Sequence, residues 1–272
     1  MTPTSRYVHG THPEEQRRLA DLNALVNRAS LDALAAAPGE RALDVGSGLG
    51  QFARALARAT GERVVAVERS PEQIARAVAL AADAGEDTLV DFRAGDALAM
   101  PLARDEWGSF DLAHARFLLE HVPAPQEVVN AMARAVRSGG RVVLEDDDHE
   151  ALRLWPDPPG VAMVWRAYIR TYDRLGNDPH VGRRLVELLA EAGLEPRRIR
   201  LLPFGACAGE ASFPAYVANL GAVLDGARDA ILATGGVSAP AFDDAQAALR
   251  VWGRRRDAAF WYSISWAEAV KP

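Results

Sequence analysis

The sequence predicts an α/β fold with a parallel sheet and right-handed crossovers. Short apolar runs alternate with helical patterns from about residue 39 to residue 146, and this alternation is typical of such sheets. A glycine-rich turn follows the first apolar run, at the point where α/β folds place nucleotide-like ligands. The chain has 272 residues, of which 49% are hydrophobic and 25% charged, so it can bury a full core and is not fibrous or disordered.

The first half of the chain provides most of the predicted elements. Ser70 with Pro71 marks the start of a helix, because serine caps helices and proline fits their first turn. In that helix one apolar face consists of Ile74, Ala77, Val78 and Ala81. The predicted strands are residues 41–45, 63–68, 88–93, 110–113 and 141–145, and the predicted helices are residues 11–37, 52–60, 70–81 and 129–136.

Beyond residue 146 the alternation is less regular. Residues 151–180 combine several prolines with an aromatic helical pattern, and residues 211–253 show a second helical stretch. The last predicted strand is residues 258–267, where Phe260, Tyr262 and Ile264 alternate with more polar positions. The other elements predicted in this half are a helix at 181–192 and a strand at 198–202.

The strongest chemical signal is the loop Asp44-Val45-Gly46-Ser47-Gly48-Leu49-Gly50. Glycines allow tight turns and close approach of a ligand to the backbone. Glu68 ends the next predicted strand, where an acid can accept hydrogen bonds from ribose hydroxyls. A dinucleotide site has the spacing Gly-x-Gly-x-x-Gly, whereas here Gln51 takes the place of its third glycine. Asp44 suits a cationic methionyl group better than a pyrophosphate.

With these motifs the chain resembles the class I S-adenosylmethionine (SAM)-dependent methyltransferases of the small-molecule type. The resemblance implies a Rossmann-like, doubly wound, seven-stranded sheet that is mostly parallel, with residues 258–267 as its one reversed strand and with helical lid insertions. The motifs that carry it follow in order over about residues 39–146, and they are LDVGSGLGQF, VVAVERSPEQ, Gly95-Asp96-Ala97, FDLAHARFLLEHV and VRSGGRVVLED.

The resemblance also implies a SAM site and its contacts. Glu68 would bind the ribose, Gln73 would lie beside the adenine, and Asp96 would meet the adenine amino group. By analogy, Tyr7 and His9 would fold over the cofactor. The implied cofactor-binding residues are Asp44, Gly46, Ser47, Gly48, Gly50, Gln51, Glu68, Arg69, Gln73, Asp96, Ala97, Ala115 and Tyr7.

The domain organisation follows from the same resemblance. The family usually joins its last two strands by a short hairpin, but here about fifty residues, 207–257, intervene. We expect this helical insertion to form a substrate cap or a dimer surface. The expected segments are an N-terminal helical lid at 1–38, a SAM-binding core at 39–146, a cap insertion at 147–180 and the rest of the core at 181–272.

The acidic stretch at residues 145–150 leaves several interpretations open. It follows the fifth predicted strand, so it should lie near the transferred methyl group. Its carboxylates and histidine could ligate a hard metal. Alternatively His149 acts as a general base, since its pKa lies near neutrality, or Asp147 orients the substrate, or the stretch is a solvated loop. We predict catalytic roles for Asp147 and His149 and no bound metal.

Arg116 is the third predicted catalytic residue. It follows the fourth strand and either binds a substrate carboxylate in a bidentate manner or pairs with Glu120 four residues on. Tyr168 and Tyr172 are predicted, with Arg116, to contact the substrate. The aromatic residues of this region favour a partly planar or apolar acceptor.

The sequence thus predicts a cytoplasmic methyltransferase that uses SAM, yields S-adenosylhomocysteine (SAH) and methylates nitrogen or oxygen of a small molecule. The net charge of −6 argues against a nucleic-acid partner, and no apolar run approaches the roughly 18 residues of a membrane span. A single cysteine, Cys207, excludes an internal disulfide and fits a reducing compartment. Three alternatives remain: SAM-dependent decarboxylation or rearrangement, a nicotinamide-dependent reductase, and a non-catalytic binding protein. A homodimer is also possible.

Overall fold

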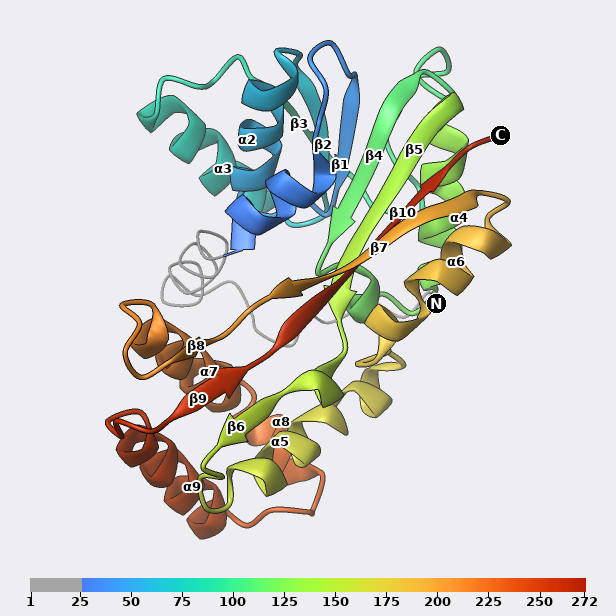
Figure 1. The fold of residues 1–272 in the computed structure, drawn as a ribbon. Helices are drawn as coiled ribbons and strands as arrows, with labels where there is room; N and C mark the ends of the chain where they lie inside the picture. The colour runs from blue at the N-terminus through green and yellow to red at the C-terminus, as the bar shows by residue number, and fades with distance from the viewer. Residues whose placement is uncertain (1–25) are drawn as a thin grey trace.

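A computed structural model describes residues 26–272 and contains a seven-stranded sheet (Figure 1). The strand order is β3-β2-β1-β4-β5-β10-β7, and β10 is antiparallel to both of its neighbours. This arrangement confirms the predicted Rossmann-like fold. The strands are β1 (Ala42–Val45), β2 (Val64–Glu68), β3 (Val90–Ala94), β4 (Phe110–Arg116), β5 (Val136–Asp147), β7 (Glu195–Pro203) and β10 (Ser263–Val270).

Helices cover both faces of this sheet because its central strands are apolar on both sides. Ala42 of β1 packs in the cluster of Phe52 and Leu56 on one face, whereas Leu43 and Val45 pack in the cluster of α4 and α6 on the other. The helices of the core are α2 (Gln51–Thr60), α3 (Pro71–Asp83), α4 (Pro125–Ala135) and α6 (Leu185–Glu191).

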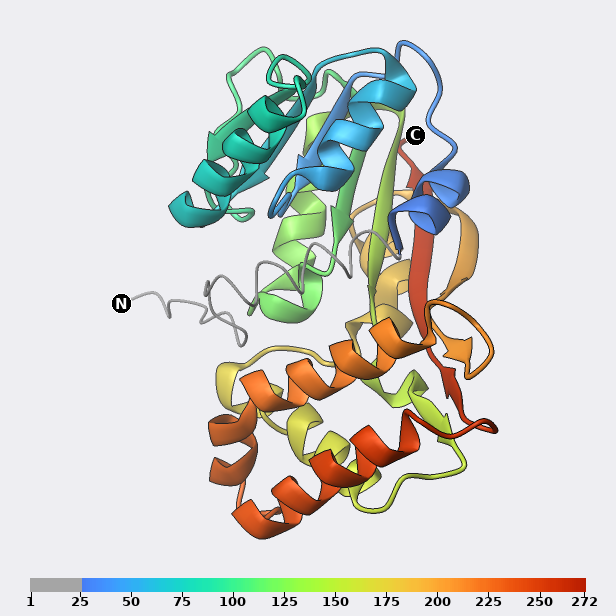
Figure 2. The same cartoon turned by 90° about the vertical axis from the view of Figure 1, so that its left-hand side faces the viewer.

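A cap lies beyond the carboxyl ends of β4 and β5 (Figures 1 and 2). Two separate parts of the chain build it, one after β5 and one between β7 and β10, and a second sheet in the order β6-β9-β8 joins them. The elements of the cap are β6 (Arg153–Trp155), β8 (Ala206–Cys207), β9 (Ala259–Trp261), α5 (Val161–Ile169), α7 (Phe213–Gly226), α8 (Arg228–Ala233) and α9 (Ala239–Trp252).

Two short 3₁₀ turns carry polar side chains that line the cavity at the cap. The first, η1, carries Glu120 and His121, and the second, η2, carries His149 directly after β5. These turns therefore place polar side chains at the edge where core and cap meet. The four 3₁₀ turns are η1 (Leu119–His121), η2 (His149–Ala151), η3 (Tyr172–Leu175) and η4 (Val181–Arg184).

Three sequence predictions need correction. The predicted strand at 258–267 is two strands, because β9 pairs in the cap and β10 in the main sheet, with Tyr262 between them. The predicted helix at 181–192 begins as the 3₁₀ turn η4. In α3, Val78 is 48% exposed and Gln73 is buried, since the helix is turned so that Gln73 faces the glycine loop.

Two further sequence predictions agree with the structure, and others concern residues before residue 26, which the structure does not describe. The Ser70 cap is confirmed, since its Oγ accepts a hydrogen bond from the backbone N–H of Gln73 at 3.2 Å. Of the predicted first helix, residues 26–34 are described and helical. Tyr7 and His9 lie outside the described residues. Between residues 26 and 272 no helix is long and apolar enough to cross a membrane.

Candidate functional site

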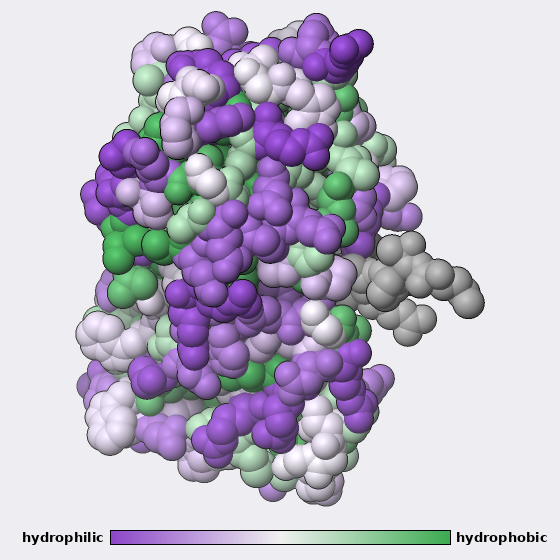
Figure 3. Space-filling model, turned by 90° about the vertical axis from the view of Figure 1, so that its right-hand side faces the viewer, coloured by the Kyte–Doolittle hydropathy of each residue, from purple (hydrophilic) through white to green (hydrophobic). Residues whose placement is uncertain are grey.

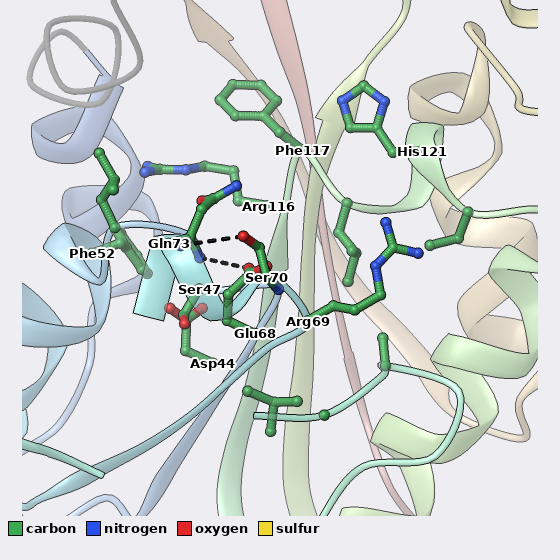
Figure 4. A pocket seen from close by; sticks show the side chains of 18 of the residues that line it. Asp44, Ser47, Phe52, Glu68, Arg69, Ser70, Gln73, Arg116, Phe117 and His121 are labelled. Carbon is green, nitrogen blue, oxygen red and sulfur yellow. Dashed lines mark hydrogen bonds between the residues drawn. The ribbon is translucent and has the colours of Figure 1, made fainter. Parts of the chain in front are cut away.

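A cavity lies at the carboxyl ends of β1, β2 and β4, beside the glycine loop (Figure 4). We call it the loop cavity. Most of the residues predicted to bind the cofactor line it, although they come from three different parts of the chain. Those residues are Asp44, Gly46, Ser47, Gly48, Glu68, Arg69, Gln73, Asp96 and Ala97.

The glycine loop is held in a shape that requires glycine. Gly46, Gly48 and Gly50 have φ angles of 76°, 53° and 67°, a region that side chains disfavour. The N–H groups of Gly46 and Ser47 donate to the carbonyl of Val67 at 2.8 and 3.1 Å, which ties the loop to β2. The loop therefore keeps one rigid conformation beside the cavity.

Glu68 lies at the wall of the loop cavity with a fixed orientation (Figure 4). Its Oε2 accepts from the N–H of Gly48 at 3.0 Å, and its Oε1 accepts from the N–H of Ser70 at 2.8 Å. Each carboxylate oxygen can accept further hydrogen bonds. Gln73 also lies close to Gly48, because a Cβ on Gly48 would come 3.1 Å from the Gln73 Oε1.

Three predicted cofactor contacts lie elsewhere. Gly50, Gln51 and Ala115 are absent from the lining of the loop cavity. A Cβ on Gly50 would come 2.5 Å from Cζ of Phe92, so Gly50 lets α2 approach β3 closely. Ala115 is buried in the core of the sheet.

His114 links strands β1, β4 and β5 beneath the loop cavity. Its Nδ1 lies 2.8 Å from Asp44 Oδ1 and its Nε2 lies 3.3 Å from Glu145 Oε1. Burial disfavours the imidazolium, but the hydrogen bonds and charges of Asp44 and Glu145 outweigh it and raise the pKa of His114. The same contacts to His114 lower the pKa of Glu145 against the effect of its burial. These contacts therefore favour the imidazolium of His114 and the carboxylate of Glu145.

Arg116 lines the loop cavity and is held by the N-terminal helix. It donates to Asn27 Oδ1 at 2.7 Å and to Ser30 Oγ at 3.2 Å, and its guanidinium lies over the ring of Phe52. The alternative pair with Glu120 does not form, since Arg116 ends a strand and Glu120 sits in the turn η1 facing the cap. A contact of Arg116 with substrate stays a prediction.

A second cavity, the cap cavity, lies between the end of β5 and the cap. It adjoins the loop cavity, because Phe117 and His121 line both. Phe117 has φ 51°, which is rare for a residue with a side chain. Such strain often marks a functional position, and here it places a ring on the border between the two cavities.

The predicted catalytic residues His149 and Asp147 line the cap cavity together with Glu120. Nε2 of His149 lies 2.9 Å from Glu120 Oε2 and 3.1 Å from the hydroxyl of Tyr172. Its Nδ1 lies 3.2 Å from the hydroxyl of Tyr262, which in turn hydrogen-bonds Asp147. Polar side chains from four segments of the sequence thus form one hydrogen-bonded network.

The charge states of these hydrogen-bonded side chains depend on their burial and on the charges of their neighbours. Burial opposes ionisation of Glu120, but His121 and His149 lower its pKa to about 2. Burial also opposes protonation of His149, but Glu120 raises its pKa overall. Burial and the nearby charge of Glu120 raise the pKa of Asp147 to about 7. Glu120 and His149 therefore form an ion pair, and Asp147 titrates near neutrality.

The predicted substrate contacts Tyr168 and Tyr172 also line the cap cavity. Their hydroxyls lie 3.0 Å apart, and the Tyr172 hydroxyl donates to Glu120 Oε2 at 3.0 Å. Both side chains are buried, and the two rings pack edge to face around the imidazole of His149. The two tyrosines therefore hold the hydrogen-bonded network of polar side chains in place and also shape the cavity.

Two groups in the described region have the spacing of metal ligands. One ligand atom from each of Glu120, Asp147 and His149 lies within 4.8 Å of the others, and a second group is formed by Asp148, Glu150 and His180. In the first group His149 and Glu120 already bond each other. In the second, Asp148 is paired with Arg183. The first group still contains one buried oxygen without a hydrogen-bond partner among the described residues, Oδ1 of Asp147.

Three residues of these clusters carry no sequence signal that points to the site. His114 lies within an apolar strand, and a histidine in such a pattern resembles an ordinary buried residue of the hydrophobic core. Glu120 was considered only as a partner of Arg116, since the turn η1 resembled a helix. Tyr262 was assigned to a continuous strand, whereas the break between β9 and β10 sits at this residue.

Comparisons with known proteins agree with this arrangement. Residues 43–144 match the family described as "Methyltransferase domain". Over 169 residues the chain is 35% identical to an uncharacterized 37.1 kDa protein in transposon TN4556 of Streptomyces fradiae. This match covers 60% of this chain and 46% of that protein. A demethylmenaquinone methyltransferase of Renibacterium salmoninarum is 34% identical over 140 residues, which cover 45% of this chain and 47% of that enzyme.

A solved structure resembles nearly the whole chain. The geranyl diphosphate C-methyltransferase of Streptomyces coelicolor A3(2) has a TM-score of 0.57 and 17% identity, over 99% of this chain and 89% of that chain. At this identity the likeness concerns the fold. The chain spans less than half the length of the curated relatives named above. Residues 43–144 thus match the methyltransferase domain family, and the fold of the chain is similar to that of a class I SAM-dependent methyltransferase.

Proposed function

We propose that this protein transfers the methyl group of SAM to a small molecule. The observation that carries the proposal is the adjacency of the two cavities, which share Phe117 and His121. The loop cavity would hold the cofactor and the cap cavity the acceptor. Alignment of the two reactants across this border would supply much of the rate.

The residues of the loop cavity fit SAM. Carboxylates at Glu68 and Asp96 offer acceptors for the ribose hydroxyls and for the adenine amino group. The buried hydroxyl of Ser47 has no hydrogen-bond partner among the described residues, so a ligand can supply one. When bound, SAM supplies an electrophilic methyl group on a sulfonium. The geranyl diphosphate C-methyltransferase was crystallised with SAH, which supports this choice.

On the acceptor side, Asp147 is the proposed general base and His149 its positioning residue. A general base acts best with a pKa near the working pH, and burial with the Glu120 charge raises the pKa of Asp147 to about 7. His149 has both ring nitrogens in hydrogen bonds, so it holds Glu120 and Tyr262 in place. Methylation of nitrogen or oxygen is consistent with this arrangement.

The proposal includes the setting of the protein. We expect a cytoplasmic location, since the chain has a single cysteine, and no nucleic-acid partner, since the net charge is −6. A homodimer would use the edge strand β7, where Ile199 and Leu201 are 66% and 72% exposed. Figure 3 shows one face of the molecule, on which hydrophilic residues are interspersed with smaller hydrophobic areas.

A labelled-methyl assay tests the proposal. The full chain is incubated with SAM labelled in its methyl group and with pools of small molecules, and label in products separated from SAM is counted. We expect transfer with at least one pool and its loss in Asp147→Asn. The matched control is Asp148→Asn, whose carboxylate binds Arg183 away from the cavity lining and should keep transfer. Failure to bind SAM at all would contradict the proposal.

A further inference from the structure

The cap cavity combines an aromatic wall with one polar corner. The wall includes Trp165, Tyr168, Phe204 and Phe260, all of which line the cavity. Trp165 and Tyr168 are stacked with ring centroids 5.0 Å apart. Faces of such rings carry negative potential and attract cations as well as apolar groups. This wall fits an apolar or planar body.

The charges at the polar corner are unbalanced. Carboxylates of Glu120 and Asp147 line the cavity, whereas the part of the chain that the structure describes provides no arginine or lysine to the lining. The imidazolium of His149 is matched by Glu120 at 2.9 Å. Among residues 26–272 Asp147 forms no ion pair, although the charge of His149 lowers its pKa, and Asp146 and Asp148 on either side are also acids.

Asp147 is also incompletely hydrogen-bonded. Its Oδ1 is buried and has no donor among the described residues, although the carboxyl group bonds Tyr262. A buried acceptor without a donor is destabilising, so a donor in the ligand would stabilise the site. A positively charged donor would satisfy the oxygen and balance the charge at once.

We infer that the methyl acceptor is an apolar molecule that carries a basic amine, and that its ammonium group binds Asp147 against the aromatic wall of the cap cavity. The inference rests on the proposed function, because it names the substrate of that same site. An anionic acceptor finds no countercharge in the described lining, and a neutral alcohol leaves the charge of Asp147 unbalanced.

The chemical step is then balanced. The ammonium passes one proton to the Asp147 carboxylate, and the freed nitrogen lone pair forms the bond to the methyl carbon. The electron pair of the carbon–sulfur bond stays on sulfur, which becomes a neutral thioether. The positive charge moves to the methylated nitrogen, and the proton on Asp147 passes to solvent when the product leaves.

Three probes that differ only in their polar group test this inference. Tryptamine, tryptophol and indole-3-acetate share an indole ring and carry an ammonium, a hydroxyl and a carboxylate. Each is titrated calorimetrically into the full chain saturated with SAH. We expect tryptamine to bind at least about 10-fold more tightly than tryptophol, with indole-3-acetate the weakest, because a charged hydrogen bond and a ring contact both favour the ammonium.

Variants assign the preference to the carboxylate. In Asp147→Asn the preference for tryptamine over tryptophol should fall to within about 2-fold, while SAH binds as before. Asp148→Asn is the matched control and should keep the preference, since Asp148 is bonded to Arg183 and is absent from the cavity lining. Binding of the amine should also release a proton at pH 7. The release is measured as a change in the heat of binding between buffers of different ionisation enthalpy, and Asp147→Asn should abolish this proton release.

The proton release depends on all groups that face Asp147. Glu120, His149, Tyr262 and Asp148 shift the pKa of Asp147, and Asp147 in turn raises the pKa of Asp146. The inference is overturned if tryptophol or indole-3-acetate binds as tightly as tryptamine, if tryptamine does not bind the SAH complex, or if Asp147→Asn keeps the preference. If SAH itself does not bind, the proposed function fails and the inference fails with it.

Discussion

The imidazole of His114 lies between two carboxylates, with Nδ1 2.8 Å from Asp44 Oδ1 and Nε2 3.3 Å from Glu145 Oε1. The three side chains come from β1, β4 and β5, which are neighbours in the sheet. All three side chains are buried. The strands that carry the loop cavity are therefore joined by charge as well as by backbone hydrogen bonds.

Replacement of His114 should change how stability depends on pH. Since the folded protein raises the pKa of His114, its stabilising charge is fully present below the unfolded pKa of about 6.5 and is lost as pH rises through the folded pKa. His114→Gln should lose about 3–5 kcal/mol near pH 6. The difference from the parent should shrink towards pH 9. Urea unfolding at several pH values measures this, and a constant difference would contradict the assigned charge.

Two glycines at the ends of α2 provide a matched pair for the packing argument. Both have positive φ, 67° at Gly50 and 73° at Gly61. A Cβ on Gly61 meets nothing within 4 Å, whereas one on Gly50 would overlap the ring of Phe92. Gly61→Ala should cost about 1–2 kcal/mol from backbone strain alone, and Gly50→Ala clearly more. Equal losses in urea unfolding would refute the role given to Gly50.

Replacement of Glu68 should weaken cofactor binding. Glu68→Gln keeps the size of the side chain but removes one acceptor and the negative charge. The hydrogen bonds of a charged group are worth about 1.5–3 kcal/mol, so we expect SAH affinity to fall by roughly 10-fold to 100-fold. Calorimetry measures this. Glu72→Gln, at an exposed neighbouring position, serves as control and should bind SAH as the parent does.

The rate of methyl transfer should depend on the ionisation of Asp147. Burial and the charge of Glu120 raise its pKa to about 7, so kcat/KM should fall as pH drops below about 7, when the base is protonated. Asp147→Asn should lower the rate by about 10²-fold to 10⁴-fold and remove this limb of the profile. The measurement uses the acceptor found with labelled SAM. If kcat/KM still falls below pH 7 in Asp147→Asn, the ionising group is not Asp147.

Replacement of His149 should separate turnover from cofactor binding. His149→Ala removes the bonds to Glu120 and Tyr262, so Asp147 loses its fixed neighbour. We expect kcat to fall while SAH affinity stays within about 2-fold, because His149 is absent from the loop cavity. Unchanged turnover would exclude a role for His149 in catalysis.

The fold could be predicted largely from the sequence, because its signals are local. The glycine loop follows β1 directly, and the Ser70 cap starts α3 as the side-chain chemistry requires. The final strand was harder to predict. Its alternating pattern continues from Phe260 to Trp266, yet the residues on either side of Tyr262 pair with different partners. Pairing of this kind depends on the cap, which periodicity does not reveal.

The candidate site could be predicted only in part. Asp147 and His149 follow a strand at the ligand-binding edge, so their position was clear from the sequence. Their partners Glu120 and Tyr262 come from segments 29 and 113 residues away from His149 along the chain. No local pattern links such residues, because the contacts arise when the cap closes on the core.

Calorimetric titration of the full chain with SAH, SAM and NADH in parallel tests the central claim most directly. The account predicts that SAH and SAM each bind at one site per chain, that NADH does not bind, and that Glu68→Gln weakens both sulfur ligands. Binding of NADH without SAH or SAM would contradict the account and would favour a nicotinamide-dependent reductase. Absence of binding by all three ligands would contradict it as well.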